Sequence, residues 1–224
     1  MVLNKQILYT SIILIFTIIF FGISNLDYVV QDNFYNFNTH SWILNKTTQP
    51  YRIIFYDGIK KILILFVLLL LFIVIFFRQN HIIKEYYKNI LLVILSAILV
   101  PVIVGGLKKS TNMPCPKNEI HYGGNIIRTS VWQGYAKPYS DMPKIACWPA
   151  GHASGGFALL SLFFLFKTRR KKYIALISAL IIGWSMAIYK IVIGDHFLSH
   201  TIITMLLAWL IILIIKKIIF FNNN

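Results

Sequence analysis

The sequence predicts an all-α integral membrane protein with six transmembrane helices. Three observations lead to this fold class. Of the 224 residues, 58% are hydrophobic, the mean hydropathy is +0.70, and apolar stretches long enough to cross a bilayer recur along the chain. A spanning helix needs roughly 17–25 mostly apolar residues, and soluble domains of this size are far less apolar. We expect residues 1–224 to form a single six-span domain.

Six stretches satisfy this length requirement. No small-residue cleavage site follows the first stretch, so we interpret it as a span and not as a signal peptide. The fifth is interrupted by Trp184 and Lys190, and His200 lies near the start of the sixth. The expected spans are residues 7–23, 60–78, 89–107, 150–166, 173–193 and 197–215.

Basic residues near the span ends predict the orientation. The connection after the fourth span is the densest positive run, at residues 167–172, and Lys216 and Lys217 follow the sixth span. We place this side in the cytoplasm and the protein in a bacterial inner membrane. The periplasmic side then holds the 24–59 and 108–149 loops and the turn near residue 194. Lysines at the outer ends of spans two and three, at positions 60, 61, 108 and 109, run against the rule.

The charge balance indicates the kind of partner. The net charge of +15 fits a membrane rich in anionic lipid. No basic soluble module is present to carry nucleic acid, so a nucleic-acid partner is not expected.

The outer loops contain few other candidates for chemistry. The aromatic and polar 24–59 loop is typical of the membrane–water interface, where we expect short interfacial helices with His40 and Trp42 as surface anchors. In the 108–149 loop we expect Arg128, Lys137 and Lys144 to be solvated.

Both cysteines, Cys115 and Cys147, fall in the 108–149 loop. In an oxidising periplasm they would form a disulfide. Closing a loop of about 33 residues would stabilise the fold by roughly 3–4 kcal/mol. With inverted topology they would instead be two free thiols, and the residues alone leave both alternatives open.

The segment from Cys147 to Gly156 is the strongest candidate for an anion site. Pro149 suits the start of a helix, whose free N–H groups around Ala150 and Gly151 favour an anion. His152 then adds a proton donor within the first turn. The alternatives are that His152 only bonds a carbonyl, and that Gly155 and Gly156 serve close helix packing, which we prefer for these two glycines.

A second polar cluster joins spans five and six. Lys190, Asp195, His196 and His200 fall within twelve residues, and titratable groups at membrane depth are costly and usually functional. Because His196 and His200 are spaced i, i+4, they share one face of a helix. Snorkelling of Lys190 to the head groups is the alternative.

With six spans, both clusters reach the same membrane face as Lys108 and Lys109, which predicts an active site there. Two histidines, several lysines and a helix N-terminus suit attack on a phosphate ester through a phospho-histidine. Zinc is the competing interpretation, with His121, His152, His196 and His200 as ligands. The His-x-x-x-His spacing lacks the glutamate of metalloprotease helices, so we expect no metal and no other cofactor.

These residues resemble the type-2 phosphatidic-acid phosphatase superfamily, the integral lipid phosphate phosphatases. The family pattern is Lys-x6-Arg-Pro, Pro-Ser-Gly-His and Ser-Arg-x5-His-x3-Asp. Here the parts read Lys108-x6-Cys115-Pro116, then Pro149-Ala150-Gly151-His152, then Tyr189-Lys190-x5-His196-x3-His200. The resemblance covers about residues 60–215. It implies that His196 is the nucleophile and His152 the acid.

Several positions depart from the family pattern, and Lys190 replaces its second arginine. Cys115 replaces an arginine, so we expect Lys108, Lys109 and Lys190 to bind the phosphate. A lysine ammonium is a point charge and lacks the two-pronged geometry with which a guanidinium binds phosphate. Ala150 replaces the serine. His200 replaces the aspartate that orients the nucleophile, and we expect it to bond His196 in that role, with Asp195 as the fallback.

The two cysteines also resemble a branch of the superfamily with Cys-Pro and Cys-x-Pro-Ala-Gly-His elements. That resemblance implies a disulfide between Cys115 and Cys147. It also implies a lipid phosphatase at the outer face of the membrane, acting on lipid A, undecaprenyl pyrophosphate or phosphatidylglycerophosphate. The alternatives are a lipid phosphotransferase that uses the same intermediate and a non-catalytic lipid-binding protein.

Overall fold

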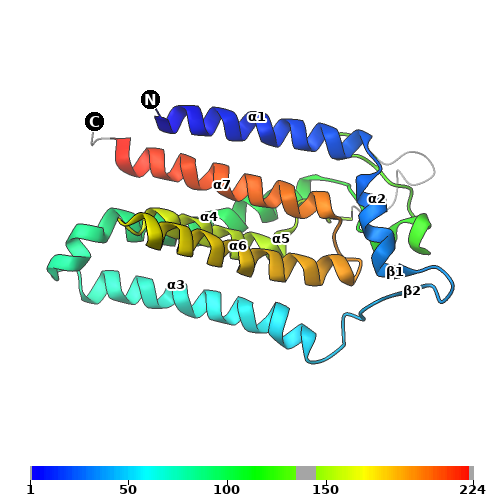
Figure 1. Cartoon of the computed structure of the whole chain (residues 1–224), viewed down its shortest axis with the longest axis horizontal. Helices are drawn as coiled ribbons and strands as arrows, with labels where there is room; N and C mark the ends of the chain where they lie inside the picture. The colour runs from blue at the N-terminus through cyan, green and yellow to red at the C-terminus, as the bar shows by residue number, and fades with distance from the viewer. Residues whose placement is uncertain (1, 135–144, 222–224) are drawn as a thin grey trace.

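In a computed structural model the chain is built almost entirely of helices that lie roughly parallel in one bundle (Figure 1). The structure describes residues 2–134 and 145–221, so Lys137 and Lys144 lie outside the described residues. The helices of the bundle are α1 (Val2–Ile23), α3 (Ile59–Phe76), α4 (His81–Ser110), α5 (Gly151–Ala158) with the 3-10 helix η6 (Leu159–Phe164), α6 (Arg169–Val192) and α7 (Leu198–Phe220).

Five of these helices are long and apolar enough to cross a membrane, and the sixth apolar segment is shorter. The all-α membrane fold is therefore confirmed. The short segment joins eight α-helical residues to six in a 3-10 helix. Because a 3-10 helix rises faster per residue, the two together extend about 24 Å, somewhat less than the ~30 Å hydrocarbon core.

α4 is longer than the expected 89–107 span, because it begins at His81 and ends at Ser110. Asn80 caps its start, with its side chain accepting a hydrogen bond from the N–H of Ile82 (2.9 Å). This cap lets the helix begin in the polar connection, before the apolar stretch that defined the span. Lys108 lies in the last turn of this helix, at its other end.

The core lies where α4, α5, α6 and α7 meet, and it holds fully buried side chains such as Val100, Phe157 and Ile212. α1 packs along α7, and α3 lies at the opposite edge of the bundle (Figure 1). α5 and α6 approach closely at Gly156, where an added Cβ would lie 2.7 Å from the Cα of Gly183. This supports the close-packing interpretation of Gly156.

A cap of short elements covers one end of the bundle. It contains α2 (Leu26–Gln31), the 3-10 helix η1 (Asp32–Phe34), a two-stranded antiparallel sheet, and two further 3-10 helices; Figure 1 shows α2 and the strands at this end. The sheet pairs β1 (Tyr35–Asn36) with β2 (Ser41–Trp42), and the later helices are η3 (Pro116–Asn118) and η4 (Ile120–Tyr122).

The cap is joined to the bundle by packing and hydrogen bonds, so the 24–59 segment does more than anchor at the interface. The side-chain amide of Gln31 donates to the carbonyl of Ile191 (2.8 Å) at the end of α6. Trp42, expected as a surface anchor, instead packs on Gly194, where an added Cβ would lie 2.3 Å from its ring. It also contacts the rings of Tyr35 and Tyr122. That expectation was wrong, because the contact between this loop and Gly194 joins residues far apart in sequence and no local pattern indicates it.

Arg128 is a second correction, because we expected it to be solvated. Its side chain is only 17% exposed and lies 3.0 Å from the carboxylate of Asp27, which is fully buried. Asp27 also accepts hydrogen bonds from the N–H and hydroxyl of Ser199, at 2.9 and 2.7 Å. Asp27 therefore caps the first turn of α7, and Arg128 balances the charge that this cap buries.

Candidate active site

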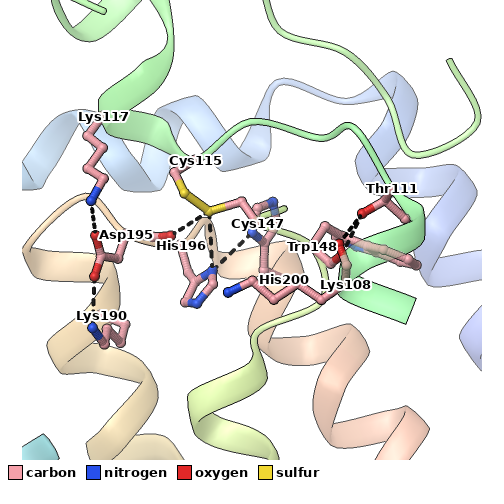
Figure 2. The surroundings of a disulfide bond; sticks show 10 residues. All are labelled: Lys108, Thr111, Cys115, Lys117, Cys147, Trp148, Lys190, Asp195, His196 and His200. Atoms are coloured by element: carbon pink, nitrogen blue, oxygen red, sulfur yellow. Dashed lines mark hydrogen bonds and ion pairs between the residues drawn. A yellow bond between two sulfur atoms is a disulfide. The ribbon is translucent and has the colours of Figure 1, made fainter. Parts of the chain in front are cut away.

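A disulfide between Cys115 and Cys147 joins the segment after α4 to the segment before α5, with Cα atoms 5.2 Å apart (Figure 2). It lies directly above the His196 turn: the Cys147 Sγ is 3.1 Å from the carbonyl oxygen of Asp195 and 3.9 Å from Nδ1 of His196. The disulfide therefore links the segments that carry Lys108 and His152, and Cys147 contacts the turn that carries His196.

The start of α5 is fixed by contacts with α7. The N–H of Ala150, the residue before the helix, donates to the hydroxyl of Thr204 (2.8 Å), so it is already engaged within the protein. The N–H groups at the head of the helix, beginning with Gly151 and His152, have no carbonyl one turn earlier to bond. His152 lies in this first turn, as expected. The N-terminus is therefore available to an anion at Gly151 and His152, while the N–H of Ala150 is engaged by Thr204.

His196 lies in the tight turn between α6 and α7. Gly194 permits this turn because its φ of 72° is in the left-handed region that favours glycine. The carbonyl of Gly194 accepts a hydrogen bond from the N–H of Lys117 (3.1 Å), which ties the turn to the cap. The His196 side chain is 2% exposed, so its ring is held within the protein.

His200, in the first turn of α7, lies beside His196, which precedes the helix, so the expectation that the two share one helix face was wrong. The two Nδ1 atoms are 3.4 Å apart, and His200 is fully buried. Because Nδ1 of His196 faces His200 and the disulfide, Nε2 is the nitrogen left to meet a substrate. Burial, and then the nearby His200 and Lys108, hold the pKa of His196 well below its usual value of 6.5. A neutral imidazole with a free nitrogen is a nucleophile.

The rings of His152 and His196 come from different segments and lie near each other, with centroids 6.4 Å apart and an angle of 49° between their planes. Two imidazoles this close can both contact one phosphoryl group bound beside them.

Lys108, Lys109 and Lys190 were expected to bind phosphate. The structure places Lys108 and Lys190 near the histidines. Figure 2 shows Lys108 extending toward the His196 ring, and its aliphatic stem passes 3.6 Å from where a Cβ on Gly151 would lie. Lys190 is 3% exposed, so it does not snorkel to the surface. Lys109 is exposed on the last turn of α4, since adjacent helical residues point about 100° apart.

Asp195 pairs with lysines on both sides. Its two carboxylate oxygens accept from Lys190 (2.8 Å) and from Lys117 (2.6 Å). Burial alone would raise the pKa of Asp195, but these two hydrogen bonds outweigh it and leave the pKa below its usual 3.8. Asp195 is therefore engaged by the two lysines. It does not orient the His196 ring, so the fallback interpretation was wrong.

One group in the described residues has metal-ligand atoms close together: Cys147, His196 and His200, with these atoms within 4.8 Å of one another. Because the Cys147 sulfur is bonded to Cys115, it is not a thiolate. Two imidazoles remain, fewer than the three protein ligands of catalytic zinc sites. His121, the other zinc candidate, bonds Asp32 in the cap instead (2.9 Å).

A family model, the PAP2 superfamily, matches residues 89–224, which is more than half of the chain. The chain belongs to the PAP2 superfamily. It is therefore a membrane member of a family of phosphatases that act on phosphate esters, as the resemblance implied. No curated protein and no solved structure matches the chain. The matched region carries Lys108, His152, Lys190, His196 and His200.

This PAP2 protein adds a residue from outside the matched region to the site. Tyr56 lies in the π-helical turn η2 (Ile53–Gly58) that precedes α3, and its hydroxyl is 2.7 Å from Nε2 of His152. Sequence reasoning missed it because no motif marks an isolated tyrosine in an aromatic-rich loop. The only available signal was a tyrosine at a span entrance, which is also typical of an interfacial anchor.

Beside Tyr56 and His152, the PAP2 protein has a cavity of about 550 Å³ between α3, α4 and α5. Its wall is mostly apolar, and the polar side chains are at one end. The residues that define it include Leu63, Val67, Ile98 and Leu159, with Tyr56 and His152 at the polar end. The cavity size is typical of a small-molecule site.

Proposed function

We propose that this protein is a lipid phosphate phosphatase that works through a phospho-histidine on His196. The observation that carries the proposal is the pair of neighbouring imidazoles of His152 and His196, 6.4 Å apart, with Lys108 and Lys190 beside them. Nε2 of His196 attacks phosphorus, and the bond to the leaving oxygen breaks as the N–P bond forms. His152 provides the proton for the leaving oxygen and later activates water.

Cations and backbone groups hold the equatorial phosphate oxygens, where negative charge accumulates. Lys108, Lys190 and the N–H groups of Gly151 and His152 are placed for this role. Ala150 contributes by shape: its buried position against α7 fixes the start of α5. Lys109 stays a weaker candidate, because its exposed position suits a head group approaching from outside more than the phosphoryl group itself.

The apolar cavity supports a lipid substrate. It lies beside His152 between α3, α4 and α5 and is lined mainly by apolar side chains. A hydrocarbon chain in this cavity would bring its ester oxygen to His152. Lipid A, undecaprenyl pyrophosphate and phosphatidylglycerophosphate all combine such chains with phosphate.

The capped end of the bundle is the site end, and we place it at the periplasmic face of a bacterial inner membrane. The positive run at residues 167–172 and the pair Lys216 and Lys217 lie at the other ends of their helices. The positive-inside rule puts those ends in the cytoplasm. The disulfide agrees with this side, since the periplasm is oxidising.

The test is release of inorganic phosphate by protein purified in detergent, using the three lipid classes named above, with and without a chelator. We expect activity on at least one lipid, unchanged by the chelator and abolished by His196→Ala. His81→Ala is the matched control, because His81 is exposed at the far end of α4. Full activity of the His196→Ala variant would exclude this mechanism.

Two alternative functions give different results in the same assay. A phosphotransferase would place the phosphate on an acceptor lipid, so labelled phosphate would appear on lipid and not in water. A non-catalytic lipid-binding protein would release no phosphate, and its lipid binding would survive His196→Ala.

A further inference from the structure

Tyr56 enters the site from a part of the chain that the family match does not cover. It lies on a six-residue π-helical turn between the cap and α3. Such turns are rare and are frequently found at functional sites. The π-helical turn therefore makes the side chain that it positions, Tyr56, a candidate for a functional role.

Contacts on both sides hold the Tyr56 ring in place. Its ring centroid lies 4.8 Å from that of His152, and its hydroxyl is 2.7 Å from Nε2 of the same histidine. The ammonium of Lys190 lies 4.3 Å from the Tyr56 ring centroid, within cation–π range. Tyr56 is thus packed between the proposed acid and a proposed phosphate-binding lysine.

The two nitrogens of His152 have different surroundings. Nδ1 is buried and has no hydrogen-bond partner among residues 2–134 and 145–221. A proton must therefore leave or reach His152 through Nε2, and the Tyr56 hydroxyl is on that route. Both side chains also line the polar end of the cavity, where the leaving oxygen would arrive.

We propose that Tyr56 relays a proton between His152 and the leaving oxygen, an inference that rests on the proposed function. As the phosphorus–oxygen bond breaks, the Tyr56 hydroxyl gives its proton to the leaving oxygen and takes one from Nε2 of the His152 imidazolium. The alcohol leaves neutral, His152 becomes neutral, and Tyr56 ends as it began. In the second step water loses a proton to Tyr56, which passes one to His152, and the N–P bond to His196 breaks.

The test compares leaving groups that need a proton with one that does not. Single-turnover formation of the phospho-enzyme is measured with dodecyl phosphate and with 4-nitrophenyl phosphate. An alkoxide requires protonation to leave, whereas a nitrophenolate departs as the anion. General acids contribute roughly 10²–10⁴-fold, so we expect Tyr56→Phe to slow the dodecyl reaction about 10²-fold and the nitrophenyl reaction less than about threefold.

The solvent isotope effect provides a second readout that a structural role would not change. In mixtures of H₂O and D₂O the wild-type dodecyl rate should fall with a curved dependence, because two protons move together. Tyr51→Phe is the matched control, since Tyr51 precedes the same π-helical turn but is 43% exposed and has no part in the proposed site. It should leave both substrates near the wild-type rate.

Three outcomes separate the possibilities. Equal slowing of both substrates by Tyr56→Phe would mean that Tyr56 only shapes the site, and no slowing would mean that His152 acts directly; either result overturns the relay. Absence of phospho-enzyme in the wild-type protein with either substrate would instead contradict the proposed function itself.

Discussion

At the scale of single residues, His200 stands where the PAP2 pattern has an aspartate. Its Nδ1 lies 3.4 Å from Nδ1 of His196, while Asp195 is engaged by Lys117 and Lys190. An imidazole is a weaker acceptor than a carboxylate, but it can fix the ring of the nucleophile. In the proposed mechanism this substitution would keep the orientation of the His196 ring but stabilise its positive charge less than a carboxylate does.

We predict that His200→Ala slows phospho-enzyme formation about 10²-fold, the scale expected when a reacting group is misplaced by about 1 Å. The effect should fall on kcat more than on KM, because His200 is fully buried. Thr201→Val, which keeps the side-chain volume at the next buried position, is the control. An unchanged kcat in His200→Ala would show that His196 is oriented by other groups.

Glu119 gives a pH-dependent prediction. Burial raises its pKa to about 7, against the opposing hydrogen bond from Tyr28 and the charge of Arg128. The folded protein therefore holds a proton on Glu119 that the unfolded chain releases near pH 4.5, so this group stabilises the fold at low pH. That stability is lost as the pH rises toward and past about 7, by on the order of 3 kcal/mol.

Glu119→Gln removes this titration while keeping an oxygen that can accept from Tyr28. The melting temperature of the variant, relative to wild type, should rise between pH 5 and pH 8 by several degrees. Thermal unfolding in detergent at both pH values measures it. A difference that is the same at both pH values would contradict the raised pKa.

At the scale of elements, the contact between α5 and α6 depends on glycine. An added Cβ at Gly156 would lie 2.7 Å from backbone of Gly183, whereas at Gly155 it would lie 3.6 Å from the end of the Leu63 side chain, an ordinary contact. The two neighbouring glycines therefore have different roles, although both were expected to serve packing.

We predict that Gly156→Ala destabilises the protein by about 1–3 kcal/mol, because two backbones must separate. Gly155→Ala should be close to neutral, and it is the matched control on the same helix. Melting temperatures of the two variants measure the difference. Equal effects would mean that the helices can shift apart without cost.

The sequence predicted these elements to different degrees. Long apolar stretches predicted the five spanning helices, because the bilayer imposes a length and a composition on each. The cap was not predicted, since Asp27, Trp42 and Arg128 are joined by contacts across more than a hundred residues. The proximity of His152 and His196 followed from topology and the family resemblance. Tyr56 could not be found without the three-dimensional packing of η2 on α5.

At the scale of the whole molecule, the disulfide joins the cap to the bundle. Cys115 and Cys147 are 32 residues apart in sequence, and this pairing, implied by the family branch, is present in the structure. Cys147 also lies against the His196 turn. The bond therefore affects both the stability of the fold and the geometry of the site.

We predict that replacing both cysteines with serine lowers the free energy of unfolding by about 3–4 kcal/mol. This is the contribution expected from the conformational entropy that the disulfide removes from the unfolded chain by closing a loop of this length. Phosphatase activity should fall as well, because the segments that bear Lys108 and His152 are no longer tied together. Melting curves and phosphate release, with and without a reductant, measure both effects. A reductant should reproduce the effect of the substitution in the wild-type protein and change nothing in the double variant.

The start of α1 and the end of α7 lie at the same end of the bundle, opposite α2 and the two strands of the cap (Figure 1). A fluorescent or enzymatic reporter can therefore be fused to either end without approaching the histidines. With the proposed orientation, a green fluorescent protein should mature on both ends, and an alkaline phosphatase fusion should stay inactive on both. This arrangement makes the sidedness of the protein readable in living cells from two independent positions, while leaving the end that holds the proposed site unobstructed.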